Sequence, residues 1–290
     1  MEIDTRFPTK LDTVDDAPEV LRSTLIEVLS SDDPIRLLIY APAFSTAGEK
    51  DPATILAVTK KGWAVVSETE GGGASTEKAD FAETLFPELT SVLLLGQLKI
   101  YFASVGTAYA ARIRFNTVGE ALYQEAINQI LSSIDPMLAT PAGSDGRETS
   151  IFKAWPIKFR CEAERYCPQG QRVLAAIQWR SIFGGFKREL APAGALIITP
   201  RELVLISEEK ASPRRLPGDL HEFGGIITFF PRVRLADFHI GHYERFGVLA
   251  LQVHATHGGE RLEVVFPANE EMELLKAMEQ VSSSADSKPN

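Results

Sequence analysis

The sequence predicts a mainly β protein of the α+β class, built from two similar modules in tandem. Two observations predict this fold. Short runs of β-branched and aliphatic residues alternate with polar turn residues, which is typical of antiparallel hairpins. The pattern also recurs, because three blocks of the first half of the chain match three blocks of the second half in the same order. The sequence therefore predicts an internal duplication in which each module begins and ends with a helix.

The beginning of each module repeats at an offset of 138. Asp16-x-x-Glu19 predicts a capped helix start, and an apolar stripe at helical spacing follows it. The second copy has a comparable stripe. The matched pairs are Pro18 with Pro156, Arg22 with Arg160, and Ile39 with Ile177.

A hairpin gives the clearest repeat. Residues 55–68 (ILAVTKKGWAVVSE) place a polar turn between two apolar runs, and residues 195–208 (ALIITPRELVLISE) do the same at an offset of 140. Leucine, threonine, serine and glutamate recur at matching positions, and most other apolar residues meet apolar ones. This pattern predicts two antiparallel strands in each copy.

Three more strands are predicted before each closing helix. The larger offset at the end of the modules implies short insertions in the second copy, mainly at residues 211–225. The predicted strands are residues 89–95, 98–103 and 110–115 in the first copy, and 233–240, 248–255 and 261–266 in the second.

The end of each module repeats at an offset of 151. In both copies a strand leads into an amphipathic helix, and Thr117-x-x-Glu120 predicts a capping box at the start of the first of these helices. Apolar residues then recur at helical spacing from Leu122 to Leu131. The matched pairs include Phe115 with Phe266, Glu120 with Glu271, Ala126 with Ala277, and Gln129 with Gln280.

The two modules are expected at residues 1–135 and 151–282. Residues 136–150 are rich in proline, glycine and small polar residues, which is typical of a linker. The polar residues 283–290 are expected to form a disordered tail.

Antiparallel strands closed by one amphipathic helix resemble the pleckstrin-homology-like (PH-like) fold. The resemblance rests on the hairpins at 55–68 and 195–208 and on the strand-to-helix junctions at 111–131 and 262–281. It implies two tandem PH-like β-sandwich or barrel modules, each with an N-terminal helix and a closing C-terminal helix. Through the phrases LLGQLKI, FNTV and FGGFKRELAP, the chain also resembles a group of bacterial tandem-module proteins, and that group implies no known activity.

The resemblance does not imply phosphoinositide binding. Lipid-binding members of the PH-like family usually carry basic residues across their first hairpin. The equivalent strands here, residues 55–59 and 195–199, contain no basic residue.

Composition and charge exclude several classes of protein. A net charge of −9 argues against nucleic-acid binding, because phosphate contacts require a cationic surface. The N-terminus lacks the apolar core of a signal peptide, and no apolar run approaches the ~20 residues that span a bilayer. Cys161 and Cys167 form no disulfide framework and are expected to be ordinary buried thiols. We therefore expect a cytoplasmic protein, with integral membrane insertion disfavoured and peripheral membrane contact left open.

The candidate binding surface lies in the second module. Phe183-Gly-Gly-Phe186 is an apolar, permissive segment followed by two bases, which could contact a partner or a membrane edge. A basic cluster could converge to hold an anionic ligand or an acidic segment, and a solvated surface balanced by glutamates is the alternative. The basic cluster consists of Lys187, Arg188, Lys210, Arg214, Arg215, Arg232 and Arg234. The candidate binding residues are Phe183, Phe186, Lys187, Arg188, Arg214, Arg215 and Arg232.

The histidines raise the question of a metal site. All five lie in the second module, and the pairs His239-x-x-His242 and His254-x-x-His257 fall on neighbouring predicted strands. Residues three apart on a strand point to opposite faces, so we expect no metal. The glycine-rich segment 71–78 lacks the Gly-Lys-Ser/Thr of a phosphate loop, and no catalytic or cofactor motif occurs.

These features leave three functional hypotheses open. The first is a non-enzymatic interaction, regulatory or scaffold protein that binds a protein partner. The second is a peripheral binder of an anionic ligand or lipid headgroup through the basic cluster. The third is a metal-dependent enzyme that uses the histidines. A convergent basic pocket would support the second, and histidines within coordination distance would support the third.

Overall fold

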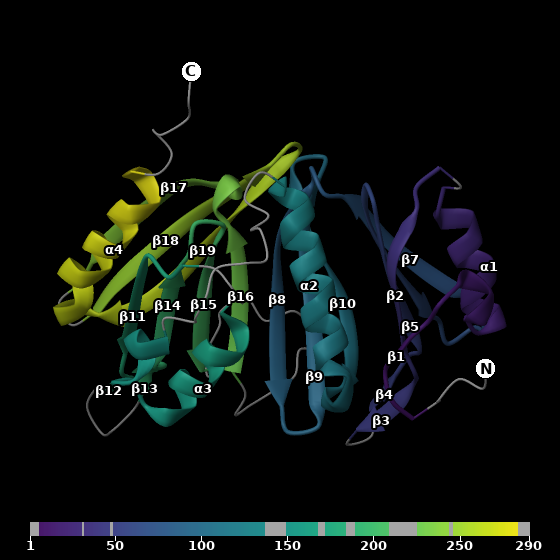
Figure 1. Ribbon diagram of the computed structural model, residues 1–290, viewed down its shortest axis with the longest axis horizontal. Helices are drawn as coiled ribbons and strands as arrows, with labels where there is room; N and C mark the ends of the chain where they lie inside the picture. Colours follow the sequence, from purple (N-terminus) through teal and green to yellow (C-terminus); the bar gives the residue numbers. More distant parts are fainter. Residues whose placement is uncertain are drawn as a thin grey trace. The chain divides into compact units, whose positions relative to one another are not determined.

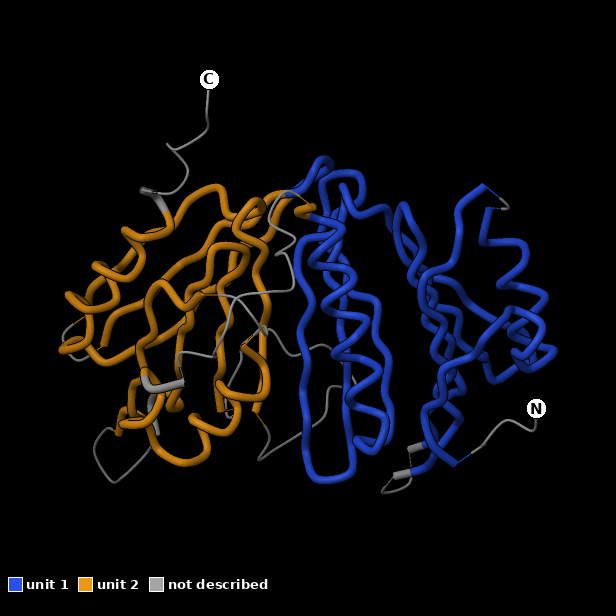
Figure 2. The backbone as a smooth tube through the Cα atoms, viewed as in Figure 1, with its two compact units in different colours: residues 1–134, 255–258 blue, residues 135–254, 259–290 orange. Residues whose placement is uncertain are grey.

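The chain folds into two compact units, which divide between Ile134 and Asp135. The computed structural model describes residues 6–30, 32–46, 49–136, 149–167, 172–183, 189–208, 225–243 and 246–283 (Figure 1). Residues 255–258 group with the first unit (Figure 2). Most of the predicted linker and almost all of the predicted tail lie outside the described residues.

Unit 1 consists of antiparallel strands with a helix near each end. Strands β1, β2, β5, β6 and β7 form one sheet in the order β1-β2-β5-β6-β7, and β8, β9 and β10 pair as a meander. Its elements are β1 (Thr9–Lys10), η1 (Val14–Asp16), α1 (Glu19–Val28), β2 (Ile35–Ala41), β3 (Phe44–Thr46), β4 (Glu49–Asp51), β5 (Thr54–Thr59), β6 (Gly62–Glu68), β7 (Ala74–Asp80), β8 (Thr84–Val92), β9 (Leu95–Ser104), β10 (Thr107–Asn116), η2 (Thr117–Gly119) and α2 (Glu120–Ile134).

Unit 2 has a comparable set of strands and helices. Strands β11, β14, β15 and β16 pair in that order, and β17, β18 and β19 form a separate three-stranded sheet. Its elements are η4 (Thr149–Phe152), α3 (Ile157–Tyr166), β11 (Ala175–Trp179), β12 (Ile182–Phe183), β13 (Glu189–Ala191), β14 (Gly194–Ile198), β15 (Glu202–Glu208), β16 (Gly225–Pro231), η6 (Arg232–Arg234), β17 (Leu235–His242), β18 (Phe246–Ala255), β19 (Gly258–Pro267), η7 (Ala268–Glu270) and α4 (Glu271–Ser283).

The elements of the two units recur at the offsets found in the sequence. Helix α3 follows α1 at 138, and β15 follows β6 at 140. Strands β18 and β19, the turn η7 and helix α4 begin 151 residues after β9, β10, η2 and α2. The mainly β class predicted from the sequence is confirmed.

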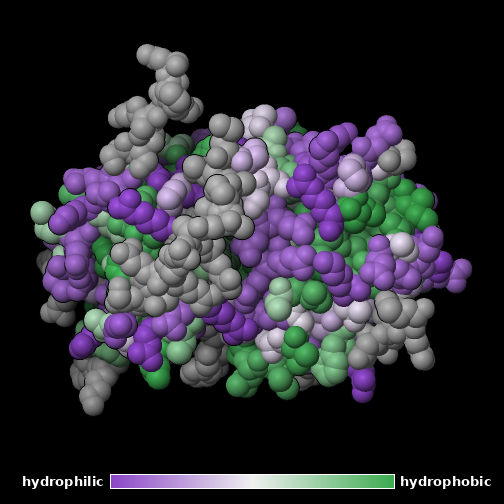
Figure 3. Space-filling view, viewed as in Figure 1, coloured by the Kyte–Doolittle hydropathy of each residue, from purple (hydrophilic) through white to green (hydrophobic). Residues whose placement is uncertain are grey.

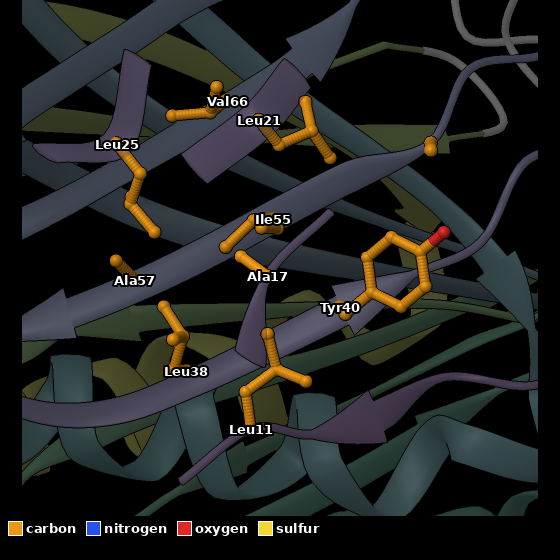
Figure 4. Packing of buried hydrophobic residues seen from close by; sticks show 10 residues of the cluster. Leu11, Ala17, Leu21, Leu25, Leu38, Tyr40, Ile55, Ala57 and Val66 are labelled. Atoms are coloured by element: carbon orange, nitrogen blue, oxygen red, sulfur yellow. The ribbon is translucent and has the colours of Figure 1, made fainter. Parts of the chain in front are cut away.

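One core of unit 1 lies between α1 and its five-stranded sheet (Figure 4). Leu21 and Leu25, one helical turn apart, are fully buried against Ile55 and Val66 of the sheet. This is the face that the i, i+4 apolar spacing predicts. The predicted helix cap at Asp16 is wrong, because the side chain of Asp16 accepts hydrogen bonds from Thr13 and α1 begins after Pro18. Asp16 ends η1 and Glu19 begins α1, so the two residues of the predicted capping motif lie in different helices.

An aromatic ring packs over a glycine at the junction between sheet and closing helix. Gly96 of β9 lies directly across from Phe115 of β10, and a Cβ atom at Gly96 would overlap the Phe115 ring. The ring of Phe115 also stacks on Tyr123 of α2, with the ring centroids 3.8 Å apart. In unit 2 the ring of Phe266 occupies the same kind of space above Gly247. Both residues of this pair repeat at the offset of 151.

The glycine-aromatic contact predicts a large effect for a small substitution. Gly96→Ala should lower the free energy of unfolding by about 1–3 kcal/mol, because the added methyl forces the Phe115 ring off its position on α2. Urea unfolding of the full chain measures this difference. Gly71→Ala is the matched control, since no atom lies within 4 Å of a Cβ built at Gly71. Equal stabilities for the two variants would contradict the packing argument.

Candidate functional site

The structure describes only part of the binding surface that the sequence predicts. Phe183 ends β12 with its side chain 60% exposed. Five other candidates lie outside the described residues, so the structure does not test whether they converge. These five are Phe186, Lys187, Arg188, Arg214 and Arg215.

Arg232 has a structural position at the end of a helix. Its guanidinium donates hydrogen bonds to the carbonyl oxygens of Gln280 at 3.4 Å and Val281 at 2.6 Å, both in the last turn of α4. It also donates to the carbonyl of Thr199 at 3.2 Å. Carbonyls in the last turn of a helix lack internal partners, and a cation there also favours the helix dipole. Burial lowers the pKa of Arg232. The side chain therefore ties α4 to the β14–β15 turn.

Removal of the Arg232 side chain should destabilise the chain. Arg232→Ala leaves these carbonyls without their donor, and we expect a loss of about 1–3 kcal/mol in the free energy of unfolding. Arg261→Ala is the control, because Arg261 is an exposed residue paired with Glu263 and should contribute at most about 1 kcal/mol. A normal stability for Arg232→Ala would instead leave this arginine available for ligand binding.

The described histidines do not assemble a reactive site. His242 lies at the end of β17, with Nδ1 2.7 Å from Oε2 of Glu271 at the start of α4. His254 faces Gln252 on β18, and His221 lies outside the described residues. No group of three or more His, Cys, Asp or Glu side chains among the described residues is arranged to hold a metal. The prediction of two buried thiols is wrong for Cys161, which is exposed on α3.

A groove of about 390 Å³ lies in unit 1 beside the end of α1 and strands β6 and β7. It carries charges of both signs, with exposed Lys61 and Lys78 near Asp80. Asp33, also on its wall, accepts hydrogen bonds from the backbone amides of Lys60 and Lys61 and so closes the β5–β6 turn. The groove therefore has no dominant charge and no group poised for chemistry.

The most unusual surface of unit 1 is the turn between β8 and β9. Leu93 and Leu94 form this two-residue turn, and their side chains are 93% and 65% exposed. Val118 of η2 is 65% exposed. The sequence predicted one strand over residues 89–95, which is wrong because β8 ends at Val92 and β9 begins at Leu95. We call Leu93, Leu94 and Val118 the apolar tip.

The backbone at the apolar tip is strained and firmly held. Leu93 has φ +53°, a conformation that a two-residue hairpin turn normally assigns to glycine. The hydroxyl of Thr117 donates to the carbonyl of Leu93 at 2.9 Å, and the amide of Thr117 donates to the carbonyl of Leu94 at 3.1 Å. These two bonds place Val118 beside the turn.

The capping box predicted at Thr117-x-x-Glu120 is therefore wrong. Asn116 accepts the amide of Val118 and starts the turn η2, while the Thr117 side chain bonds to the β8–β9 turn. The carboxylate of Glu120 accepts a hydrogen bond from Ser91 at 3.0 Å. Both residues of the motif thus connect the start of α2 with the apolar tip.

No charge adjoins the apolar tip in the chain. Residues 89–98 and 115–119 contain no Lys, Arg, Asp or Glu. Of the charged residues that border these segments, Glu88, Lys99 and Glu120 are buried and Arg114 is half-buried. Figure 3 shows hydrophobic surface at the lower edge of the view, where Figure 1 places the turn between β8 and β9.

The second copy of the repeat has polar residues where the first has the apolar tip. At the offset of 151, Leu93 and Leu94 correspond to Glu244 and Arg245 in the sequence, and Val118 corresponds to Asn269. Sequence reasoning missed the tip because Leu-Leu carries no turn signal. The signal that could have found it is this change from charged and polar to aliphatic residues within one repeat.

No protein-family model matches this chain, and no curated protein matches it. Among the described residues, no helix has the length and apolar character needed to cross a bilayer.

Proposed function

We propose that this protein is a non-enzymatic interaction protein, regulatory or scaffolding, that docks onto another molecule through its apolar tip. The observation that carries the proposal is the exposure of Leu93, Leu94 and Val118 on a turn of unusual conformation. Both units are proposed to be PH-like modules, a suggestion supported by antiparallel strands that end in a helix. Function belongs to sites and not to folds, so the proposal rests on the tip.

Leucine at position 93 does not serve the stability of the chain. A left-handed backbone conformation costs a residue with a side chain about 1–2 kcal/mol, and an exposed side chain recovers none of this by packing. Exposed aliphatic residues gathered at one place are typical of a surface that another molecule covers. The polar residues at the equivalent place in the second copy support a function specific to the first unit.

The basic-cluster and histidine hypotheses have less support. Of the seven candidate binding residues, only Phe183 and Arg232 are described, and Arg232 is bonded to backbone carbonyls. The idea of an anionic ligand in the second module stays a prediction. The described histidines give the enzyme hypothesis no cluster to build on.

Substitution of Leu93 should separate docking from stability. Leu93→Gly should raise the free energy of unfolding by roughly 0.5 kcal/mol, because relief of the strained φ exceeds the added entropy of the unfolded chain. The same change removes the most exposed side chain of the tip and should reduce docking. Urea unfolding measures the first effect, and fractionation of gently lysed source cells measures the second.

The fractionation compares chain in large assemblies or membrane pellets with chain that migrates as the free protein. We expect Leu93→Gly to move most of the bound chain to the free position. Val105→Asn is the matched control, since Val105 is a 95% exposed turn residue with φ +50° at the opposite end of β9. It should gain stability in a similar way and leave docking unchanged. Identical distributions for the wild type and Leu93→Gly would contradict the proposed function.

A further inference from the structure

We infer that the apolar tip inserts into the interfacial layer of a lipid bilayer, and that it does so without help from anionic lipid. The inference rests on the proposed function, because it names the molecule onto which the tip docks. Three properties of the tip carry it: the chemistry of its side chains, its protruding shape and the absence of charged residues from the two segments that form it.

The side chains of the tip suit a hydrocarbon phase better than a protein pocket. Its three members are aliphatic, and residues 91–97 and 116–119 contain no Tyr, Trp or Arg, the residues that dominate the binding energy of protein interfaces. Leu93 is almost fully exposed at the end of a hairpin, so it protrudes and offers no pocket to a partner. A bilayer requires no complementary shape, and depth alone decides how much apolar surface it covers.

Polar groups stand just behind the aliphatic side chains. Ser91 lies two residues before Leu93, and Asn116 and Thr117 directly precede Val118. Each of the three forms an internal hydrogen bond. The polar atoms of these residues and the backbone of the turn would therefore keep their internal hydrogen bonds when they enter the headgroup layer. Backbone groups in a membrane need such internal bonds, because the hydrocarbon supplies none.

Charge decides which lipid the tip can use. The chain carries a net charge of −9, which opposes approach to an anionic surface. The tip segments contain no Lys or Arg that could offset this repulsion. A zwitterionic surface has no such barrier. Residues 89–98 and 115–119 contain no charged side chain, so insertion of these segments desolvates no charge of their own.

The expected binding is weak and reversible. The exposed parts of three aliphatic side chains offer a smaller apolar contribution than one myristoyl chain, for which the association constant is about 10⁴ M⁻¹. A protein with binding this weak is stably anchored to a membrane only if it makes a second membrane contact. The tip therefore suits a protein that binds membranes transiently.

The test uses the purified full chain and vesicles of phosphatidylcholine, with and without phosphatidylserine. Co-flotation should give a measurable association constant below about 10⁴ M⁻¹ for phosphatidylcholine. Phosphatidylserine should not increase it, and added salt should not decrease it. The double variant Leu93→Glu/Leu94→Arg, which copies the residues of the second repeat, should bind at least about tenfold more weakly.

Two further variants separate loss of apolar surface from other causes. Leu93→Gly adds no charge and should also bind more weakly, while Val105→Asn should bind like the wild type. In a Leu94→Trp variant, nitroxide-labelled lipid should quench the new tryptophan more than the native ones, of which Trp63 and Trp179 are buried. Urea unfolding of each variant confirms that it is folded.

Three results would overturn the inference: no binding to phosphatidylcholine, equal binding by the tip variants and the wild type, or binding that needs anionic lipid and disappears in salt. If vesicle binding fails but Leu93→Gly still releases the chain from assemblies in cell extracts, the partner is a protein and the proposed function stands. If both measurements fail, the tip is not a docking surface.

Discussion

The packing of an aromatic ring over a glycine positions the closing helix of unit 1, and the same glycine-aromatic pair is present in unit 2. In unit 1 the ring of Phe115 fills the space that a side chain at Gly96 would need, and its stacking on Tyr123 fixes α2 against the meander. Because η2 connects Phe115 to α2, the same contact fixes the turn at Thr117. Thr117 in turn holds the backbone of Leu93 and Leu94. The shape of the apolar tip therefore depends on a contact in the core.

The two units show how one duplicated framework can support different surfaces. The glycine and the aromatic residue are kept in both copies, at an offset of 151, because neither can change without disturbing the junction of sheet and helix. The tip is free of that constraint, and its residues differ completely between the copies. Arg232 in the second unit stabilises the fold, since its guanidinium donates a hydrogen bond to a carbonyl in the last turn of α4. A basic residue that the sequence offers as a ligand-binding candidate can thus have a structural role instead.

Much of the fold could be predicted because its periodic patterns are local. Leu21 and Leu25 of α1 follow a spacing that requires one face to be buried, and the hairpin at residues 55–68 has the continuous apolar runs of strands buried on both faces. The capping motifs were misleading, since Asp16 belongs to a capping box that begins at Thr13 and Thr117 bonds to the distant β8–β9 turn. The turn at Leu93 could not be predicted from the sequence either, because its geometry comes from strand pairing and not from residues that prefer turns.

The sequence by itself determined the duplication, the mainly β class and the order of elements, since all three follow from repeated patterns of apolar and polar residues. Tertiary structure decided which apolar residues are covered. Val92 and Leu95 are strand residues on either side of the turn, while Leu93 and Leu94 between them are exposed. The difference arises because burial depends on what packs against a side chain from distant parts of the chain. Hydrophobicity alone records only the tendency to be buried, and at the apolar tip no part of the unit satisfies it.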